Sequence, residues 1–171
     1  MKILTKIVML AAVCVASLTF SSCNKDGGSS EPAIYGKWQS VKYKHVNEDG
    51  TVDIKYATDD ELTIYEFGMN GSVHIYDEYD QYDIYGKDFL YHSSVVQEGT
   101  FLLNGDDLTM TFTHLTWTRT YEDGRVETEE EDAPNGEGTV TLNLCELTSN
   151  EMVLYQEIGR ESAYGYFERI N

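Results

Sequence analysis

Cysteine is scarce in this chain of 171 residues, which excludes a disulfide-stabilised fold. There are three cysteines, Cys14, Cys23 and Cys145. We expect Cys14 to be removed with an N-terminal signal and Cys23 to be modified by lipid, so Cys145 has no partner for an intramolecular disulfide. Residues 140–145 alternate as in a strand, which favours Cys145 as a small buried hydrophobe over a reactive thiol.

Basic residues are also few, with 12 lysines and arginines against 30 aspartates and glutamates. Residues 1–22 hold two of the basic residues and no acid, so the other 149 residues have a net charge of −20. This charge argues against a nucleic-acid partner, because phosphates require the opposite sign. It also disfavours peripheral binding to anionic lipid headgroups.

No hydrophobic run is long enough to cross a membrane as a helix. The longest, residues 7–20, has about 14 residues, whereas a bilayer core of about 30 Å needs about 20. Its length and the flanking Lys2 and Lys6 are typical of a secretory signal peptide. We therefore predict that residues 1–22 are a signal peptide.

The sequence Phe20-Ser21-Ser22-Cys23 resembles the cleavage site of bacterial lipoproteins. The resemblance implies that Cys23 carries the lipid and attaches the protein to the outer membrane. An ordinary cleaved signal with an incidental cysteine is the alternative. Residues 23–33 are polar and small, which predicts a flexible tether. Lys25-Asp26 only weakly resembles a surface-targeting signal, so the periplasmic face and the cell surface both stay open.

Strand signals dominate after residue 33. Runs rich in Val, Ile, Thr, Tyr and Phe are separated by Gly, Asn and Asp clusters that suit tight turns, and no segment has a sustained helical period. The predicted strands are residues 36–46, 61–67, 72–78, 97–103, 107–118, 138–147, 151–157 and 163–170. Eight short, regularly spaced strands predict one all-β domain over residues 34–171, either a sandwich or an antiparallel up-and-down barrel.

Two irregularities are expected within this pattern. In the strand at 107–118, the apolar residues change parity between Phe112 and Leu115, which predicts a β-bulge near Thr113-His114. Two further turn sequences look like hairpin tips inside longer excursions, Glu48-Asp49-Gly50 and Glu122-Asp123-Gly124.

Several short motifs, taken in order, resemble the lipocalin-like domains of bacterial lipoproteins. They are Gly36-Lys37-Trp38 and residues 66–73, 99–110, 147–154 and 166–169. The resemblance covers nearly all of residues 34–170 and implies an eight-stranded antiparallel up-and-down lipocalin-like barrel. The second lipocalin signature, of the Thr-Asp-Tyr type, is missing. The interior of such a barrel holds either one small ligand or only side chains.

In lipocalins the tryptophan of the first motif closes one end of the barrel against an arginine from near the last strand. The resemblance implies this structural role for Trp38 and Arg169, next to Gly36. A guanidinium stacked on the indole would stabilise the closure by apolar burial and a cation–π interaction. The alternative is an ordinary core residue at Trp38 and an exposed surface residue at Arg169.

The stretch from Tyr76 to Tyr91 is the candidate interaction surface. The residues concerned are Tyr76, Asp77, Tyr79, Asp80, Tyr82, Asp83 and Tyr85. Tyrosine recurs there every third residue, which fits neither a strand nor an α-helix, so both faces would carry tyrosine. These side chains form either a rim that contacts glycan, protein or a cation, or an edge hairpin whose acids oppose aggregation.

No motif predicts catalysis or a bound metal. The possible metal ligands are histidines and clustered acids: His45, His74, His92 and His114, and Glu127, Glu129, Glu130, Glu131 and Asp132. The histidines lack zinc-ligand spacing, and the acids resemble a solvated segment. A hydrolase pair of His114 with Ser93 or Ser94 lacks a nucleophile elbow. We expect no enzyme activity, no catalytic residue, no cofactor and no metal.

The sequence thus predicts a lipid-anchored outer-membrane protein that acts by binding. The leading hypothesis is capture of a small apolar or amphipathic ligand at the mouth of the barrel. The alternative is a surface interaction module that uses residues 76–91. We expect the protein to be a monomer.

Overall fold

The computed structural model describes residues 33–58, 60–83, 86, 88–133 and 138–171. The predicted signal peptide, Cys23 and the tether up to residue 32 lie outside the described residues, as does Tyr85. Among the residues that are described, no helix is long and apolar enough to cross a membrane.

The described residues form ten β-strands. They are β1 (Gly36–Val46), β2 (Val52–Tyr56), β3 (Glu61–Phe67), β4 (Ser72–Tyr82), β5 (Phe89–Asn104), β6 (Asp107–Tyr121), β7 (Val126–Asp132), β8 (Thr139–Leu147), β9 (Glu151–Ile158) and β10 (Glu161–Ile170). Each of the eight predicted strands corresponds to one of them, and β2 and β7 are additional.

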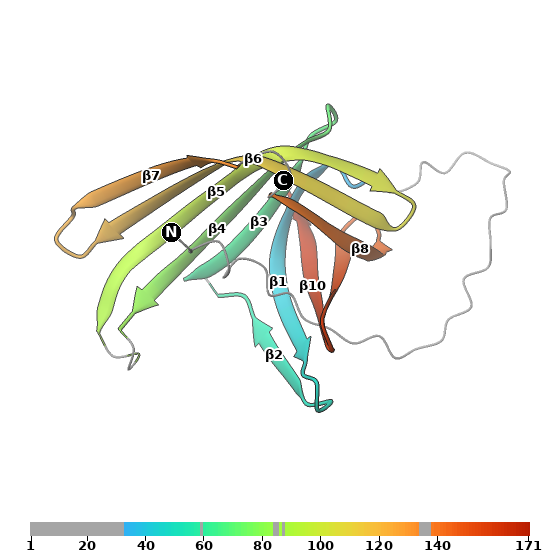
Figure 1. Cartoon of the computed structure of the whole chain (residues 1–171), viewed down its shortest axis with the longest axis horizontal. Helices are drawn as coiled ribbons and strands as arrows, with labels where there is room; N and C mark the ends of the chain where they lie inside the picture. Colours follow the sequence, from blue (N-terminus) through green and yellow to red (C-terminus); the bar gives the residue numbers. More distant parts are fainter. Residues whose placement is uncertain (1–32, 59, 84–85, 87, 134–137) are drawn as a thin grey trace, which may run out of the picture.

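Eight of these strands close into an antiparallel barrel. Their order is β1-β3-β4-β5-β6-β8-β9-β10, and β10 pairs with β1 to complete the circle. Apart from β2 and β7, each strand lies beside the next one along the chain, so the connectivity is up-and-down (Figure 1). The all-β, eight-stranded antiparallel barrel predicted from the sequence is confirmed, and the sandwich is excluded.

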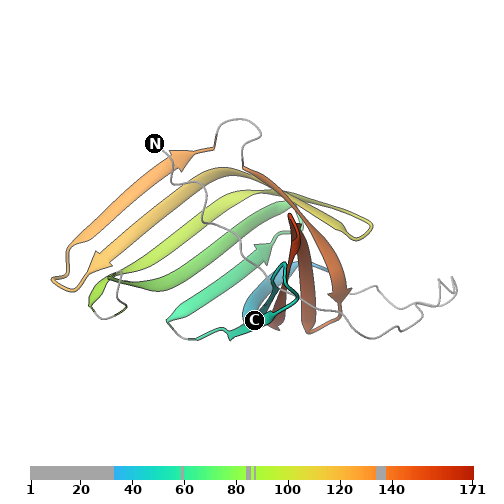
Figure 2. The ribbon, with the colours of Figure 1, turned by 60° about the horizontal axis from the view of Figure 1, so that its bottom comes forward.

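The two additional strands lengthen two walls of the barrel. β2 pairs with residues 42–46 of β1, beyond the residues 36–39 that pair with β3. Likewise, β7 pairs with residues 114–120 of β6, beyond the residues 107–111 that pair with β8. The walls diverge there: β4 to β7 extend to one side, whereas β1 and β2 project to another (Figures 1 and 2). The barrel is therefore closed at one end and splayed at the other.

Both predicted hairpin tips are confirmed. Gly50 and Gly124 have positive φ angles of 82° and 81°, a conformation that glycine adopts without steric cost. Their N–H groups donate to the carbonyl oxygens of Asn47 and Tyr121, at 2.9 Å in both turns. These turns connect β1 to β2 and β6 to β7.

The predicted bulge in β6 is confirmed and lies at Thr113. Glu98 of β5 pairs with His114 and the next residue, Gly99, pairs with Phe112, so Thr113 is the extra residue. A Cβ atom added to Gly99 would lie 2.1 Å from the carbonyl oxygen of Thr111. Only glycine fits this close approach of the two backbones.

The hydrophobic core fills the closed end of the barrel. Its largest fully buried apolar side chains are Trp38, Phe67, Phe167, Leu108, Met110, Leu142, Met152, Leu154 and Val73. Within a strand they occupy alternate positions, because successive side chains point to opposite faces of a sheet.

Trp38 and Arg169 lie together at this end. Trp38 is fully buried and donates its indole N–H to the carbonyl oxygen of Ile34 at 2.6 Å. The guanidinium carbon of Arg169 lies 4.1 Å from the centroid of the Trp38 ring. Arg169 also donates to the carbonyl oxygens of Ser149 at 2.6 Å and of Ala33 at 2.7 Å. Through these contacts, Trp38 and Arg169 connect the start of β1 to β10 and to the turn before β9.

Gly36 lies directly under this arginine. A Cβ atom added at Gly36 would approach Arg169 Nη1 to 2.9 Å, and its φ angle of 113° is rare for residues with side chains. The structure thus brings Gly36, Trp38 and Arg169 into one cluster.

Candidate functional site

A cavity of about 1130 Å³ lies between the diverging walls of the barrel. β1, β2 and β10 line one side of it, and β3 to β6 line the other. The floor of the cavity is formed by apolar side chains at the boundary with the core: Met110, Phe112, Val140, Leu142 and Phe167. Ligand cavities in proteins typically measure about 300–1,000 Å³, so the space accommodates a small molecule.

The cavity contains a polar cluster, which consists of Asp77, Thr63 and Gln97 on the wall formed by β3 to β5, together with Tyr43 of β1. Asp77 follows buried Ile75 by two positions in β4, so it points inward, and it lies opposite Thr63 in the β3–β4 register. Burial raises the pKa of the Asp77 carboxyl group, and hydrogen bonds from Thr63 and Gln97 act in the opposite direction. Burial also raises the pKa of Tyr43. The cavity therefore contains a carboxyl group whose ionisation is opposed by its surroundings.

The raised pKa of Asp77 predicts a pH-dependent cost to stability. Because the folded state holds this proton more tightly than the unfolded chain, the free energy of unfolding should fall as the pH rises from about 4 to the folded-state pKa. We expect Asp77→Asn to stabilise the protein at pH 7, by about 1.4 kcal/mol for each unit of the raised pKa, and to have little effect near pH 3.

Urea unfolding of Asp77→Asn between pH 3 and pH 8 checks this expectation. Asp80→Asn is the matched control, because Asp80 lies on the outer face of the same strand beside His92. A stability difference for Asp77→Asn that does not change with pH would contradict it.

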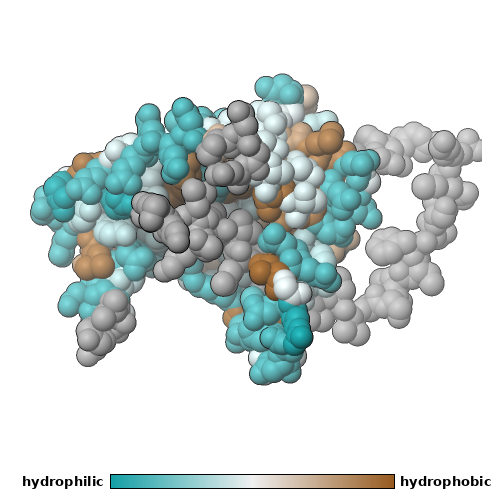
Figure 3. All heavy atoms as spheres, viewed as in Figure 1, coloured by the Kyte–Doolittle hydropathy of each residue, from teal (hydrophilic) through white to brown (hydrophobic). Residues whose placement is uncertain are grey.

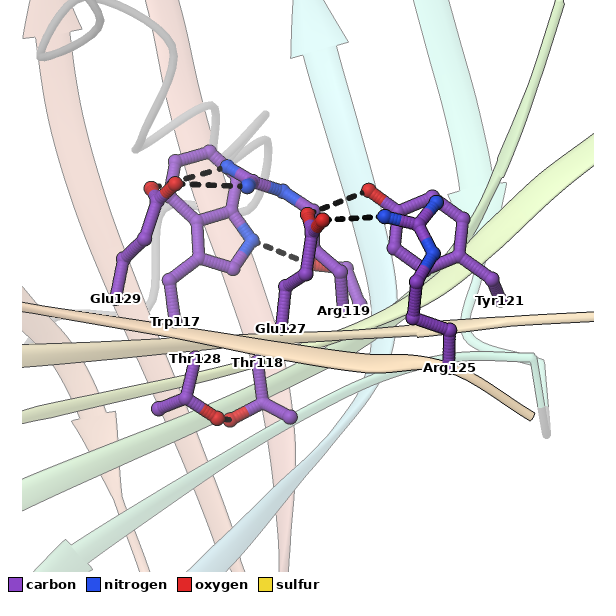
Figure 4. A network of polar contacts seen from close by, with 9 residues as sticks. Trp117, Thr118, Arg119, Tyr121, Arg125, Glu127, Thr128 and Glu129 are labelled. Atoms are coloured by element: carbon purple, nitrogen blue, oxygen red, sulfur yellow. Dashed lines mark hydrogen bonds and ion pairs between the residues drawn. The ribbon is translucent and has the colours of Figure 1, made fainter.

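An aromatic wall, defined by Tyr91, Trp117 and Arg119, stands beside the polar cluster. Trp117 donates its indole N–H to Ser93 Oγ at 2.5 Å. The guanidinium carbon of Arg119 lies 4.7 Å from the centroid of the Trp117 ring and 5.8 Å from that of Tyr91. Two hydrogen bonds of 3.1 and 3.3 Å connect Arg119 to the carboxylate of Glu129 (Figure 4). The wall is therefore ordered by its own contacts before any ligand binds.

Figure 4 shows that the side chains of Trp117, Arg119 and Glu129 leave one face of the β6–β7 hairpin, whereas those of Thr118 and Thr128 leave the other. Further along the same face, Tyr121 donates to the carboxylate of Glu127 at 2.8 Å, and the Arg125 guanidinium carbon lies 3.7 Å from the centroid of the Tyr121 ring.

The residues of this wall are not among those that the sequence pattern indicated as functional. The available signal was a run of large side chains at alternate positions, Trp117, Arg119 and Tyr121, just before a hairpin tip, with glutamates at alternate positions after it. An alternating pattern of this kind places the glutamates opposite the arginine and the aromatic residues once the hairpin forms.

The structure divides the Tyr/Asp-rich segment between the two faces of β4, and the described residues do not form one surface. Asp77 and Tyr79 line the cavity. Tyr76, Asp80 and Tyr82 have the opposite parity and point outward. The other described residue, Asp83, follows β4 in the turn before β5, where its N–H donates to the carbonyl oxygen of Asp88 at 2.8 Å.

The outward residues have local partners. The phenol of Tyr76 donates to Glu66 at 3.5 Å, and Asp80 Oδ1 lies 2.9 Å from His92 Nδ1. The space-filling view in Figure 3 shows a mainly hydrophilic surface with scattered hydrophobic side chains.

Each of the four histidines lies beside a carboxylate. The pairs and their nitrogen–oxygen distances are His45–Glu161 at 3.1 Å, His74–Glu98 at 3.2 Å, His92–Asp80 at 2.9 Å and His114–Asp132 at 2.8 Å. Within the part of the chain that the structure describes, no group of three or more His, Cys, Asp or Glu side chains could hold a metal ion.

Neither a protein-family model nor a curated protein sequence matches this chain. Similar solved structures include a lipocalin-like protein from Bacteroides uniformis, with 16% identity and a TM-score of 0.43, covering 80% of this chain and 98% of that chain. A streptavidin-like protein from Bacteroides eggerthii has 10% identity and a TM-score of 0.45, covering 80% and 82%. An uncharacterized protein from Bacteroides eggerthii has 17% identity and a TM-score of 0.44, covering 81% and 100%.

The strand order and direction of this chain define its architecture independently of these comparisons. Eight antiparallel strands, each beside the next along the chain and closed by β10 on β1, are the arrangement found in lipocalins. The described domain is a lipocalin-like barrel.

Proposed function

We propose that this protein binds one amphipathic small molecule in the cavity of its barrel. The observation that carries the proposal is the combination of an apolar floor with a few polar groups on one wall. Ligand sites commonly have this composition: apolar surface supplies most of the binding free energy, and a small number of polar groups orient the ligand.

The two regions suggest how such a ligand lies. Its apolar part covers Met110, Phe112 and Val140 on the floor, where each Å² removed from water contributes about 25 cal/mol. Its polar part faces Asp77 and Gln97 on the wall. Because burial opposes the ionisation of Asp77, we expect a neutral or cationic polar group rather than an anionic one.

Filling the floor of the cavity should weaken ligand binding. Val140→Trp adds a large side chain to the cavity, and we expect it to weaken the affinity for N-phenyl-1-naphthylamine, a neutral amphipathic fluorophore, at least about tenfold, or about 1.4 kcal/mol. Fluorescence titration measures the affinity. Native mass spectrometry of the protein purified from its own host then identifies the natural ligand class.

The matched control is Thr141→Trp, which places the same side chain one position along β8 on the exposed outer face. This variant should bind like the unchanged protein. Equal binding by both variants, or fluorescence that does not saturate, would show that the probe binds outside the cavity.

Attachment to the outer membrane through Cys23 remains a prediction from the sequence, since residues 1–32 lie outside the described part of the chain. Lack of enzyme activity likewise remains a prediction. A surface module built from the whole Tyr/Asp-rich segment has less support, because Asp77 and Tyr79 belong to the cavity.

A further inference from the structure

The strands β2 and β7 each have a free edge in the described structure, because β2 pairs only with β1 and β7 only with β6. A free edge offers unpaired N–H and C=O groups to another strand. In β7, five of the seven residues are acidic, so a second acidic strand beside it would be repelled. β2 lacks this protection: its sequence, Val52-Asp53-Ile54-Lys55-Tyr56, carries one acid and one base.

β2 is also unusually apolar for an uncovered strand. All five of its residues are exposed, and Val52, Ile54 and Tyr56 retain 44%, 52% and 66% of their accessible surface. Figure 1 shows β2 projecting from the body of the molecule with β1 alongside it. Exposed apolar side chains on an unpaired strand are the usual mark of an interaction edge.

The hydrogen bonds to β1 show which backbone groups of β2 are free. At the two ends of the hairpin, the N–H of Asn47 donates to the carbonyl of Thr51 at 2.9 Å, and the N–H of Ala57 donates to the carbonyl of Val41 at 3.1 Å. Antiparallel ladders alternate between bonded and non-bonded pairs, so the odd-numbered residues of β2 bond to β1. The N–H and C=O groups of Val52, Ile54 and Tyr56 therefore point to the free edge.

We propose that two copies of this chain pair through their β2 edges, antiparallel about a two-fold axis at Ile54. In this register Ile54 lies opposite Ile54 of the second copy and Val52 lies opposite Tyr56. In the two remaining pairs, Asp53 of each copy lies opposite Lys55 of the other copy. Each of these pairs therefore joins opposite charges. The strand is complementary to itself in hydrogen bonding, apolar side chains and charge, which a symmetric interface requires.

Both charged residues already have a partner within one chain. Asn47 Nδ2 donates to Asp53 at 3.0 Å, and Lys55 contacts Glu61. Each retains capacity for another contact, since a carboxylate accepts several hydrogen bonds and an ammonium donates three. Because Asp53 and Lys55 line the rim of the cavity, each copy would contribute two charged side chains next to the cavity of the other.

A pairing of two five-residue strands is a small interface, so we expect a weak, concentration-dependent dimer. The sequence alone predicts a monomer, and the difference arises from β2, which sequence analysis did not identify as a strand. A monomer at every concentration would overturn the proposal.

Cysteine cross-linking of the full chain in detergent tests the register. Facing residues in a bonded antiparallel pair have Cα atoms about 5.5 Å apart, within the range that a disulfide spans. Ile54→Cys should therefore form a covalent dimer on mild oxidation. Val52→Cys is the matched control on the same face, because it would lie about 13 Å from its own counterpart.

A charge swap tests the same contacts without a covalent bond. Asp53→Lys should abolish the dimer in sedimentation equilibrium, and Asp53→Lys combined with Lys55→Asp should restore it. Equal cross-linking of Ile54→Cys and Val52→Cys, or no restoration by the double swap, would overturn the proposed register. Restoration together with selective cross-linking at position 54 would establish it.

Discussion

Replacing Trp38 by alanine is expected to destabilise the protein by about 3–5 kcal/mol, the range measured for large aromatic residues in cores. The indole is fully buried, its N–H group donates to Ile34, and its ring carries the Arg169 guanidinium at 4.1 Å. The substitution removes apolar contacts and leaves a cavity at the closed end of the barrel. It also leaves the arginine without the surface on which it is stacked.

Urea unfolding followed by circular dichroism measures this loss. Trp117→Ala is the matched control, because Trp117 is only partly buried at the cavity wall, and its removal should cost clearly less. Arg169→Lys separates the contribution of Arg169 from that of Trp38. Lysine keeps the charge but lacks the planar guanidinium group that donates to the carbonyl oxygens of Ser149 and Ala33. A cost for Trp38→Ala no larger than that for Trp117→Ala would show that the closure does not depend on Trp38.

Replacing Gly99 by alanine is expected to cost about 3 kcal/mol, at the upper end of the usual range for overpacking. The new methyl group would lie 2.1 Å from the Thr111 carbonyl oxygen and 2.8 Å from the Phe112 Cα atom. Both obstacles are backbone atoms next to the bulge at Thr113, so a change of side-chain rotamer cannot relieve the contact. The β5–β6 ladder would have to shift.

Gly105→Ala distinguishes this contact from the general cost of losing a glycine. Gly105 has a positive φ angle of 62° and no atom within 4 Å of an added Cβ, so its replacement should cost only about 1 kcal/mol. Both variants are compared in the same unfolding experiment. If Gly99→Ala is as stable as Gly105→Ala, the close approach of β5 to β6 does not limit the residue at this position.

The pattern of residues predicted most of the barrel because it repeats locally. Leu108, Met110 and Phe112 alternate inward along β6, and the change of parity at Leu115 identified the bulge before any partner strand was known. β2 and β7 escaped prediction for the complementary reason. Neither strand has apolar residues that face the core: β7 is almost entirely acidic, and β2 alternates apolar and polar residues over only five positions, all of them exposed.

The candidate site was less predictable than the fold. The period of three in the Tyr/Asp-rich segment gave no indication of which residues share a face. Pairing of β4 with β3 and β5 sends Asp77 and Tyr79 inward and Tyr76 outward. The aromatic wall depends in addition on the β6–β7 hairpin, which brings Glu129 against Arg119.

The sequence by itself determined the number of barrel strands and their turns, because side-chain alternation and glycine-containing turns are properties of neighbouring residues. The residue pattern left a sandwich and a barrel open, and only the resemblance to lipocalin-like domains implied the up-and-down order. Only the tertiary structure decided that the barrel is splayed, that Asp77 lies in a cavity and that β2 keeps a free edge. These features depend on which strands pair over which part of their length. That pairing joins residues far apart in the chain, such as Gly36–Gln39 with β3 and Lys37–Val46 with β10.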